Sequence, residues 1–327
     1  MISTPELEQE NRNLALRGVV PPLLTPFTQE DEVDEASLRK QVDRLIAAGV
    51  DALFALGSTG ETVFLTREDR KKVIATIIDQ AAGRVPVAVG LIDTTTPRVL
   101  QLAADAVELG AHALVVTAPF YVRISRPEIE RHFRLIHEAF PETPIFAYNI
   151  PVSVHVVLDP ELLITLARDG VLAGVKDSGG VDGATRALVE ARDAAGNEAA
   201  NFAILTGSEM TVDLNYFFGV DGVVPGLGNV DPAGYVELAR AATAGQWERA
   251  REEQQRLNAL MQIAFVGDLG RMGGSAAGVG GFKAAMHHLG VFETGLMAPP
   301  HTPLNEQEIA KIGEIVDAAE IREPQAR

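Results

Sequence analysis

Gly49-Val50-Asp51-Ala52 ends an amphipathic stretch and begins a short apolar run, and the same junction recurs as Gly110-Ala111-His112-Ala113 and Gly219-Val220-Asp221-Gly222. Gly170-Val171 has a similar place in the pattern. A glycine at the end of a helix readily takes the left-handed conformation that turns the chain into a following strand. The repeated junction therefore predicts alternating helices and strands.

Eight short apolar runs are the expected strands. They lack the polar alternation of half-exposed strands, which is typical of parallel strands buried on both faces. The runs are Gly18–Leu24, Ala52–Leu56, Pro86–Gly90, Ala113–Val116, Ile145–Tyr148, Leu172–Lys176, Ala203–Leu205 and Gly222–Val224. Longer stretches of helical periodicity separate them, with expected N-caps at Asp34, Thr66, Thr96, Asp159 and Asp231.

Eight strands that alternate with eight helices predict an α/β protein with a (β/α)8 or TIM barrel. An open doubly wound sheet usually has a glycine-rich fingerprint after its first strand. Here the first run continues into Pro21-Pro22-Leu23-Leu24-Thr25-Pro26, which cannot form that fingerprint. The barrel is the better interpretation.

We expect three segments: an N-terminal extension (1–17), the barrel (18–244) and a C-terminal helical region packed on it (245–327). The last segment is predicted to contain helices at Trp247–Val266, about Gly281–Leu289 and Glu306–Ala319. Gly267–Gly281 is rich in glycine and is expected to be a loop between two of these helices. It lacks the lysine and the preceding strand of a phosphate-binding loop.

The composition excludes several classes of function. The chain has 327 residues, and 28 basic against 45 acidic side chains give a net charge of −17. This charge disfavours nucleic acids and anionic membranes as partners. The absence of cysteine excludes disulfides, thiolate catalysis and iron–sulfur clusters. The acidic N-terminus does not resemble a signal peptide, and no run reaches the ~20 apolar residues that cross a bilayer, so we expect a cytoplasmic protein.

Lys176 is the first candidate for catalysis, because it ends the apolar run Leu172–Lys176. Function in such barrels collects at the carboxyl ends of the strands. Burial there disfavours the ammonium form, and a neutral amine can form a Schiff base with a carbonyl. A structural ion pair with Asp177 or another carboxylate is an equally simple interpretation. The other lysines fall in stretches expected to be helical and solvated: Lys40, Lys71, Lys72, Lys283 and Lys311.

Three further strand ends carry polar or aromatic groups. Tyr148 ends the fifth run, where a phenol can relay protons, although an aromatic residue there often serves packing. Gly57-Ser58-Thr59-Gly60-Glu61 follows the second run, and its hydroxyl and backbone N–H groups can hold a carboxylate. Tyr121 follows the fourth run in Pro119-Phe120-Tyr121. Each signal is weak when it is taken alone.

Together, Gly57-Ser58-Thr59-Gly60-Glu61, Tyr148-Asn149-Ile150-Pro151 and Lys176-Asp177-Ser178 resemble the dihydrodipicolinate synthase/N-acetylneuraminate lyase family of pyruvate-dependent class I aldolases. The resemblance covers roughly Gly18 to Leu289. Further matches are Thr25-Pro26-Phe27, Pro119-Phe120-Tyr121, and Gly222-Val223-Val224 followed by Asn229.

The resemblance implies that Lys176 forms an imine with a small 2-oxo acid such as pyruvate. Ser58 and Thr59, with Gly57, would hold the carboxylate, and Tyr148 would shuttle protons. Tyr121 would reach in from a neighbouring subunit of a dimer, and a homotetramer is expected. Val224 would lie beside the substrate.

No metal or organic cofactor is expected, since the imine itself acts as the electron sink. The histidine pairs of the chain do not have the spacing of metal ligands. His132 and His137 are five residues apart on an expected helix, and the side chains of the neighbours His287 and His288 diverge. These histidines are interpreted as structural or solvated.

Departures from the family pattern bear on the substrate. Dihydrodipicolinate synthases carry an arginine at the position of Ser153, where it binds the carboxylate of the aldehyde substrate. Loss of such a contact removes ~1.5–3 kcal/mol. His155 stands where the family usually has glycine. Of the acidic pair that sialic acid lyases use after the seventh strand, only Glu209 is present, next to Ser208. With Ser178, these groups suit a polyhydroxylated chain.

The expected function is a Schiff-base lyase, aldolase or dehydratase, that acts on pyruvate and a sugar-derived 2-oxo acid such as a 2-keto-3-deoxy sugar acid. One alternative is 4-hydroxy-tetrahydrodipicolinate synthase, which joins pyruvate to aspartate semialdehyde. An alternative of another class is a non-catalytic regulator that binds a 2-oxo acid. A phosphate-binding isomerase barrel would need Pro225-Gly226-Leu227-Gly228-Asn229 as its phosphate loop, and we interpret that segment as the closing loop of the barrel.

Overall fold

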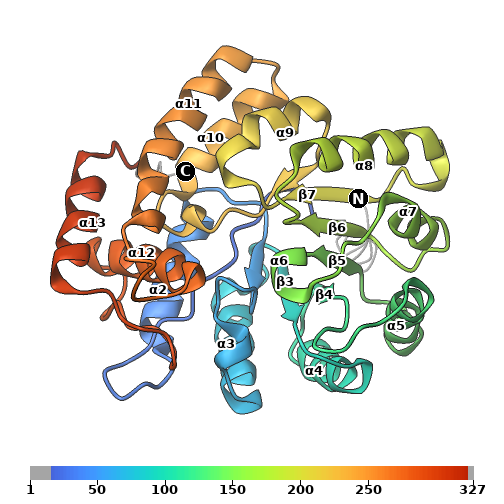
Figure 1. The fold of residues 1–327 in the computed structure, drawn as a ribbon, viewed down its shortest axis with the longest axis horizontal. Helices are drawn as coiled ribbons and strands as arrows, with labels where there is room; N and C mark the ends of the chain where they lie inside the picture. The colour runs from blue at the N-terminus through green and yellow to red at the C-terminus, as the bar shows by residue number, and fades with distance from the viewer. Residues whose placement is uncertain (1–15, 323–327) are drawn as a thin grey trace, which may run out of the picture.

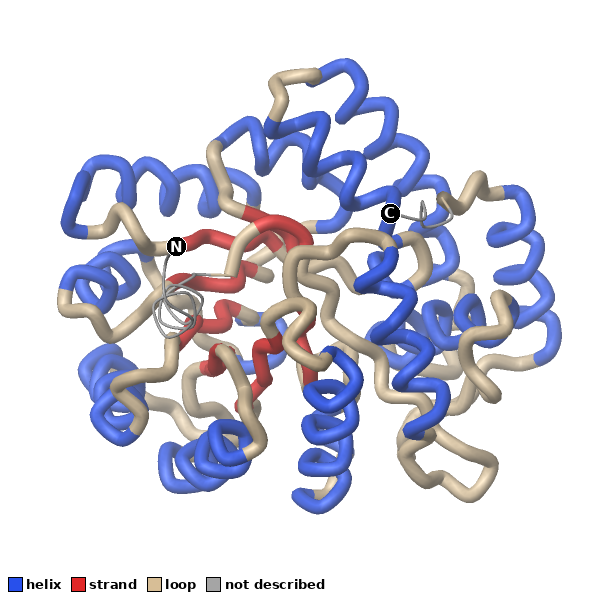
Figure 2. The backbone as a smooth tube through the Cα atoms, turned by 180° about the vertical axis from the view of Figure 1, so that it is seen from behind, coloured by secondary structure: helices blue, strands red, loops and turns tan. Residues whose placement is uncertain are grey.

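The structure is a computed structural model that describes residues 16–322 (Figure 1). Within these residues, eight parallel strands form one sheet in the order β1-β8-β7-β6-β5-β4-β3-β2. The strands lie at the centre of the molecule and the helices surround them (Figure 2). The bounds of the strands are β1 (Gly18–Val19), β2 (Leu53–Ala55), β3 (Val87–Leu91), β4 (Ala113–Thr117), β5 (Ile145–Asn149), β6 (Gly174–Asp177), β7 (Ala203–Thr206) and β8 (Gly222–Val223).

Helices connect successive strands and continue beyond the last one. Those within the barrel are α2 (Glu35–Ala47), α3 (Arg67–Ala81), α4 (Thr96–Glu108), α5 (Arg126–Ala139), α6 (Pro151–Val154), α7 (Pro160–Arg168), α8 (Asp182–Ala195), α9 (Val212–Phe218) and α10 (Pro232–Thr243). The C-terminal ones are α11 (Trp247–Leu260), α12 (Gly274–His288) and α13 (Glu306–Ala318). Short 3-10 turns are η1 (Thr62–Phe64), η2 (Gly196–Glu198), η3 (Glu209–Thr211), η4 (Leu227–Asn229) and η5 (Met261–Phe265).

The barrel closes between its first two strands through a short bridge. Leu23 N donates to Phe54 O (2.9 Å), and Phe54 N donates to Pro21 O (3.0 Å). Because Pro21 and Pro22 have no N–H to donate, the regular ladder of the first strand ends at Val19 rather than at Leu24. The predicted (β/α)8 barrel is confirmed, with this shorter first strand.

Two large apolar clusters form most of the core. The first lies between the strands and the helices, and includes Leu38, Ile77 and Phe133. The second fills the barrel itself and includes Phe54, Phe146 and Tyr148. A barrel of this size is packed with side chains rather than hollow, so groups at its upper end rest on a solid floor.

The junction glycines behave as their positions predict. Gly49, Gly110, Gly170 and Gly219 all have positive φ angles, of 88°, 97°, 71° and 102°. A side chain at these positions would be strained, because the left-handed region is costly for residues with a Cβ atom.

Most of the predicted N-caps are confirmed. The side chains of Asp34, Thr66, Asp159 and Asp231 each accept a hydrogen bond from a backbone N–H in the first turn of the following helix. The prediction for α4 was wrong by one residue. Thr95 has the extended backbone of an N-cap, and Thr96 is the first helical residue.

The expected loop at Gly267–Gly281 was partly wrong, because α12 already begins at Gly274. The glycines inside this helix permit close packing rather than flexibility. A Cβ atom at Gly281 would lie 2.2 Å from Ile263 O in η5, and one at Gly280 would lie 3.1 Å from the Met297 side chain. Such contacts between distant segments cannot be read from local composition.

The C-terminal helices α12 and α13 pack against each other (Figure 1), and the segment that follows α12 reaches the start of α2. Thr294 Oγ1 donates to Phe27 O (2.7 Å), and Glu293 N donates to Ser37 Oγ (3.1 Å). Of the predicted N-terminal extension, residues 1–15 lie outside the described part of the chain, as do residues 323–327. No helix within residues 16–322 has the length and apolar character required to cross a membrane.

Candidate active site

Lys176 and Tyr148 are direct neighbours on two adjacent strands. The parallel register of β5 and β6 pairs their Cα positions. Lys176 Nζ donates a hydrogen bond to the Tyr148 hydroxyl over 3.0 Å. Both side chains are almost fully buried, at 5% and 2% exposure. The strand ends therefore hold an amine and a phenol in contact, out of bulk water.

Aromatic rings surround the amine. Lys176 Nζ lies 4.1 Å from the centre of the Tyr148 ring and 5.0 Å from that of Phe54. The two rings meet edge to face, with centres 6.4 Å apart. Phe54 comes from β2, so three strands contribute to this pocket.

The neighbours of the Tyr148 phenol change its acidity. Burial by itself raises the pKa of this phenol. The nearby Lys176 charge and hydrogen bonds with Lys176, Ser58 and Ser178 outweigh burial, and the pKa of Tyr148 is lowered from its ordinary value. A lower pKa makes the phenol a better proton donor and relay near neutral pH.

The loop after β2 brings Ser58 to this pair. Ser58 Oγ and the Tyr148 hydroxyl lie 3.4 Å apart. The neighbouring Thr59 is half-buried, and Gly57 is buried. A Cβ atom at Gly57 would lie 2.8 Å from the Phe54 ring, so a larger residue would displace either the loop or the ring.

Asp177 is not the partner of Lys176. Its carboxylate accepts hydrogen bonds from Asn149 Nδ2 (2.7 Å), Thr185 Oγ1 (2.7 Å) and Gly179 N (3.0 Å). Successive residues of a strand point to opposite faces, which places Asp177 away from the amine. The ion-pair interpretation of Lys176 is thus wrong, and Asp177 with Asn149 instead fixes the loops after β5 and β6. Alternation along β6 could have predicted this separation.

Tyr121 and Ser153 are not buried beside Lys176 in the protomer. Tyr121 is 93% exposed and has a φ of 77°, and its side chain makes no hydrogen bond with any described residue. Ser153 lies on the exposed side of α6. His155, just after α6, has a φ of 57°, in the left-handed region that a glycine would occupy without strain.

The predicted substrate contacts near β7 and β8 differ in their environments. Ser178 reaches the Tyr148 phenol, and Val224 is buried in the cluster that fills the barrel. Glu209 accepts a hydrogen bond from Leu227 N over 2.7 Å and lies 3.4 Å from the Tyr235 hydroxyl. Burial raises the pKa of Glu209 to about 7, although these hydrogen bonds and Lys176 oppose the rise. In the free protein, Glu209 thus holds the loop after β8, and its role in substrate binding stays a prediction.

Lys283 was expected to be solvated, and this was wrong. It lies on α12 with a side chain that is 0% exposed and forms an ion pair with the fully buried Glu61. Burial lowers the pKa of Lys283 to about 8, against the opposing effect of Glu61. Its helical pattern was identified correctly, but burial by the barrel depends on packing between distant segments.

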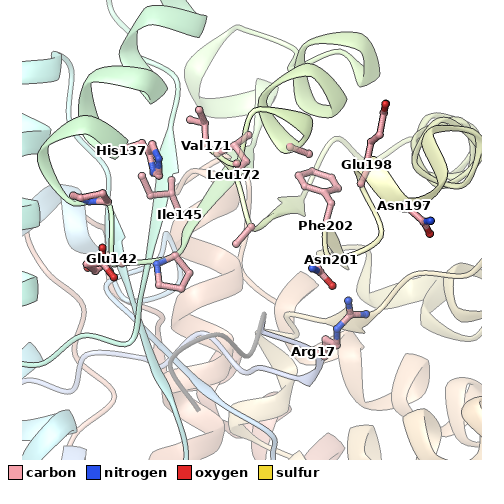
Figure 3. A pocket seen from close by; sticks show the side chains of 17 residues that line it. Arg17, His137, Glu142, Ile145, Val171, Leu172, Asn197, Glu198, Asn201 and Phe202 are labelled. Atoms are coloured by element: carbon pink, nitrogen blue, oxygen red, sulfur yellow. The ribbon is translucent and has the colours of Figure 1, made fainter. Parts of the chain in front are cut away.

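A cavity of about 560 Å³ lies at the opposite end of the barrel (Figure 3). Its lining includes Arg17, Ile145, Leu172 and Phe202, which precede or begin their strands. None of the predicted site residues lines this cavity. The candidate site residues lie instead at the carboxyl ends of the strands, where function collects in barrels of this type.

Comparison with known proteins identifies the family of the chain. The profile described as the dihydrodipicolinate synthetase family matches residues 15–319. The chain belongs to this family. It is 32% identical over 295 residues to the 4-hydroxy-tetrahydrodipicolinate synthase of Desulfotalea psychrophila, an alignment that covers 90% of this chain and 94% of that protein.

Solved structures agree with this assignment. One is a prophage protein of the dihydrodipicolinic acid synthase family from E. coli K12 in complex with pyruvate, at 28% identity and a TM-score of 0.86, covering 94% of this chain and 99% of that one. Another is a monomeric dihydrodipicolinate synthase variant, at 27% identity and a TM-score of 0.83, covering 93% of this chain and 96% of that one.

Members of the family are class I lyases that form a Schiff base between a lysine and pyruvate, without a metal or an organic cofactor. The chain is therefore an enzyme of this class. The assignment does not identify its second substrate, which depends on groups around the mouth of the barrel.

Proposed function

We propose that the chain is a Schiff-base lyase that cleaves or forms a sugar-derived 2-oxo acid, such as a 2-keto-3-deoxy sugar acid, with Lys176 as the nucleophile. The observation that carries this proposal is the chain of contacts from the buried Lys176 Nζ to the buried Tyr148 hydroxyl (3.0 Å) and on to the more exposed Ser58 Oγ (3.4 Å). It joins a nucleophile, a proton relay and a predicted carboxylate-binding loop. The proposal requires no metal or organic cofactor.

In the cleavage direction, the neutral Lys176 amine adds to the C2 carbonyl of the 2-oxo acid. The carbinolamine loses water as Tyr148 gives its proton to the departing hydroxyl, which leaves a protonated imine and a Tyr148 phenolate. The C4 hydroxyl then gives its proton to this phenolate as the C3–C4 bond breaks. An aldehyde leaves, and the bonding electrons move into the imine to form an enamine. Tyr148 returns the proton to C3, and hydrolysis of the imine releases pyruvate, restores Lys176 and gives a proton back to the phenolate.

Ser58 and Thr59 hold the carboxylate of the 2-oxo acid in this proposal. Ser58 already lies next to the relay phenol, so a carboxylate bound at the loop would place the adjacent C2 carbonyl near Lys176. Positioning of this kind is a large part of catalysis, because it makes the attack effectively unimolecular.

We further propose that Tyr121 completes the relay in a second copy of the chain. Its exposure of 93% and its left-handed backbone support this role, because they project a phenol away from the body of the protomer. A dimer is then the smallest working unit, and a tetramer made of two dimers is the expected assembly. The similarity to a monomeric variant makes this assembly a question for experiment.

The substrate preference rests on Ser153. The serine leaves α6 without the cation that would bind the carboxylate of aspartate semialdehyde. Arg123 is exposed, and forms no ion pair within the described residues. The second candidate is 4-hydroxy-tetrahydrodipicolinate synthase, favoured by the names of the relatives and by this free arginine. Its reaction would require Arg123 or another cation to replace the missing contact.

Treatment with borohydride in the presence of pyruvate should leave one stable adduct per chain, and peptide mapping should place it on Lys176. Lys176→Met should abolish the adduct. Lys311→Met is the matched control, because it removes an exposed lysine of α13 and should leave the adduct on Lys176. An adduct on Lys283, or none in the wild type, would contradict the assignment, and absence of any adduct would favour a binding protein without activity.

Mixing two inactive variants tests the shared site. Lys176→Met removes the nucleophile and Tyr121→Phe removes only the phenol hydroxyl, so each homogeneous protein should lose most activity. In a mixed dimer, one of the two sites combines an intact Lys176 with an intact Tyr121. Such a dimer should regain up to about half of the activity of the wild-type dimer. Subunit exchange under mild denaturation followed by an activity assay measures this. No recovery, or full activity of Tyr121→Phe, would remove Tyr121 from the shared relay.

Assays of both reactions side by side test the substrate. Cleavage of a 2-keto-3-deoxy sugar acid should have a kcat/KM at least about tenfold above that of condensation with aspartate semialdehyde, since ~1.4 kcal/mol of lost ion pairing gives this factor. Ser153→Arg should improve the condensation, whereas the uncharged Ser153→Gln should not. Equal or better condensation by the wild type would establish the synthase as the correct function.

A further inference from the structure

A buried ion pair joins the C-terminal region to the loop after β2. Lys283 Nζ contacts Glu61 Oε1, donates to Leu296 O over 2.8 Å and lies 4.1 Å from the centre of the Phe27 ring. Glu61 Oε2 accepts from Ala298 N (2.8 Å) and lies 3.2 Å from His301 Nδ1. Every one of these partners of Glu61 comes from beyond the last barrel helix.

Stability alone is a poor explanation for such a pair. The removal of two charges from water costs several kcal/mol per ion, and well-packed apolar residues in their place are often neutral or stabilising. The geometry that the pair imposes is a better explanation. The backbone contacts of Glu61 identify the segment whose geometry the ion pair imposes.

Glu61 closes the turn that carries Ser58 and Thr59. Its N–H donates to Ser58 O over 3.1 Å, and the N–H of Gly60 donates to Gly57 O over 3.1 Å. Thr25 Oγ1 also donates a hydrogen bond to Gly60 O over 2.8 Å. Glu61 has a φ of 55°, in the left-handed region, which is unfavourable for a residue with a side chain. A glycine would avoid this strain but would lose the anchor on the C-terminal region.

The anchored turn also leaves little room for adjustment. A Cβ atom at Gly60 would lie 2.9 Å from Leu23 O, so the turn is pressed against the segment that closes the barrel. With one side against that segment and the Glu61 side chain held by α12, the Ser58 hydroxyl is kept beside Tyr148.

We propose that the Glu61–Lys283 pair is a positioning device through which the C-terminal helical region holds the Ser58–Thr59 turn in the geometry that binds the carboxylate of the 2-oxo acid. This rests on the proposed function, in which that turn binds the carboxylate. Neither residue touches the reacting atoms in this proposal. The C-terminal region then contributes to substrate affinity rather than only to the stability of the barrel.

The test uses Glu61→Gln/Lys283→Met, which removes both charges and keeps similar side-chain volumes. The rate of borohydride trapping on Lys176 is measured at limiting pyruvate and, separately, with acetone, a ketone without a carboxylate. Trapping with pyruvate should slow by about tenfold or more, which corresponds to about 1.4 kcal/mol of lost binding free energy. Trapping with acetone should change less than about threefold. Lys311→Met is the matched control, because Lys311 is an exposed lysine of α13 and its loss should change neither rate.

If the double variant is trapped with pyruvate at the wild-type rate, the proposal is overturned. It is also overturned if the trapping rates with pyruvate and with acetone fall equally, because that would indicate general disturbance of the site. If the double variant does not fold, Glu61→Asp replaces it, since this change keeps the charge and withdraws the carboxylate by one methylene. It should also weaken pyruvate selectively, and unchanged selectivity overturns the proposal. Failure of the proposed function itself would look different, since the wild type would then form no adduct on Lys176.

Discussion

The contact between the Lys176 amine and the Tyr148 hydroxyl depends on the register of two parallel strands. A shift of one residue between β5 and β6 would move one of the two groups to the opposite face of the sheet, because side chains alternate along a strand. The packed interior of the barrel holds that register, and the Phe54 ring closes the space beside the amine. The loops after β2, β5 and β6 then need only short polar networks to bring Ser58 and Ser178 to the same phenol.

The two buried lysines show how the surroundings decide the chemistry of one residue type. Lys283 contacts a carboxylate, a backbone carbonyl and an aromatic ring, so its amine is already engaged by other groups. Lys176 contacts a phenol and two rings, and forms no carboxylate pair among residues 16–322. Only the second arrangement leaves the amine beside a phenol and clear of a carboxylate, which is the setting that the proposed attack on a carbonyl requires. The nearest carboxylate in sequence, Asp177, is occupied by Asn149 and Thr185.

Features that depend on local pattern could be predicted from the sequence. The junction glycines, most of the N-caps and the positions of Lys176 and Tyr148 at strand ends follow from periodicity and from backbone preferences of single residues. Features that depend on contacts between distant segments could not. The glycine-rich start of α12 packs closely against a distant segment, with Gly281 against Ile263, and Lys283 is buried in an ion pair with Glu61. Neither contact can be inferred from the composition of the sequence around it.

Exchange of the C3 protons of pyruvate in deuterium oxide tests most directly whether the Lys176–Tyr148 contact is a working relay. Exchange requires imine formation and reversible loss of a C3 proton, and it needs no knowledge of the second substrate. The account predicts that the wild type removes the methyl proton signal of pyruvate, that Lys176→Met does not, and that Tyr148→Phe is slower by about 10²–10⁴-fold. Wild-type protein that binds pyruvate without exchange, or Tyr148→Phe protein that exchanges at the wild-type rate, would contradict it.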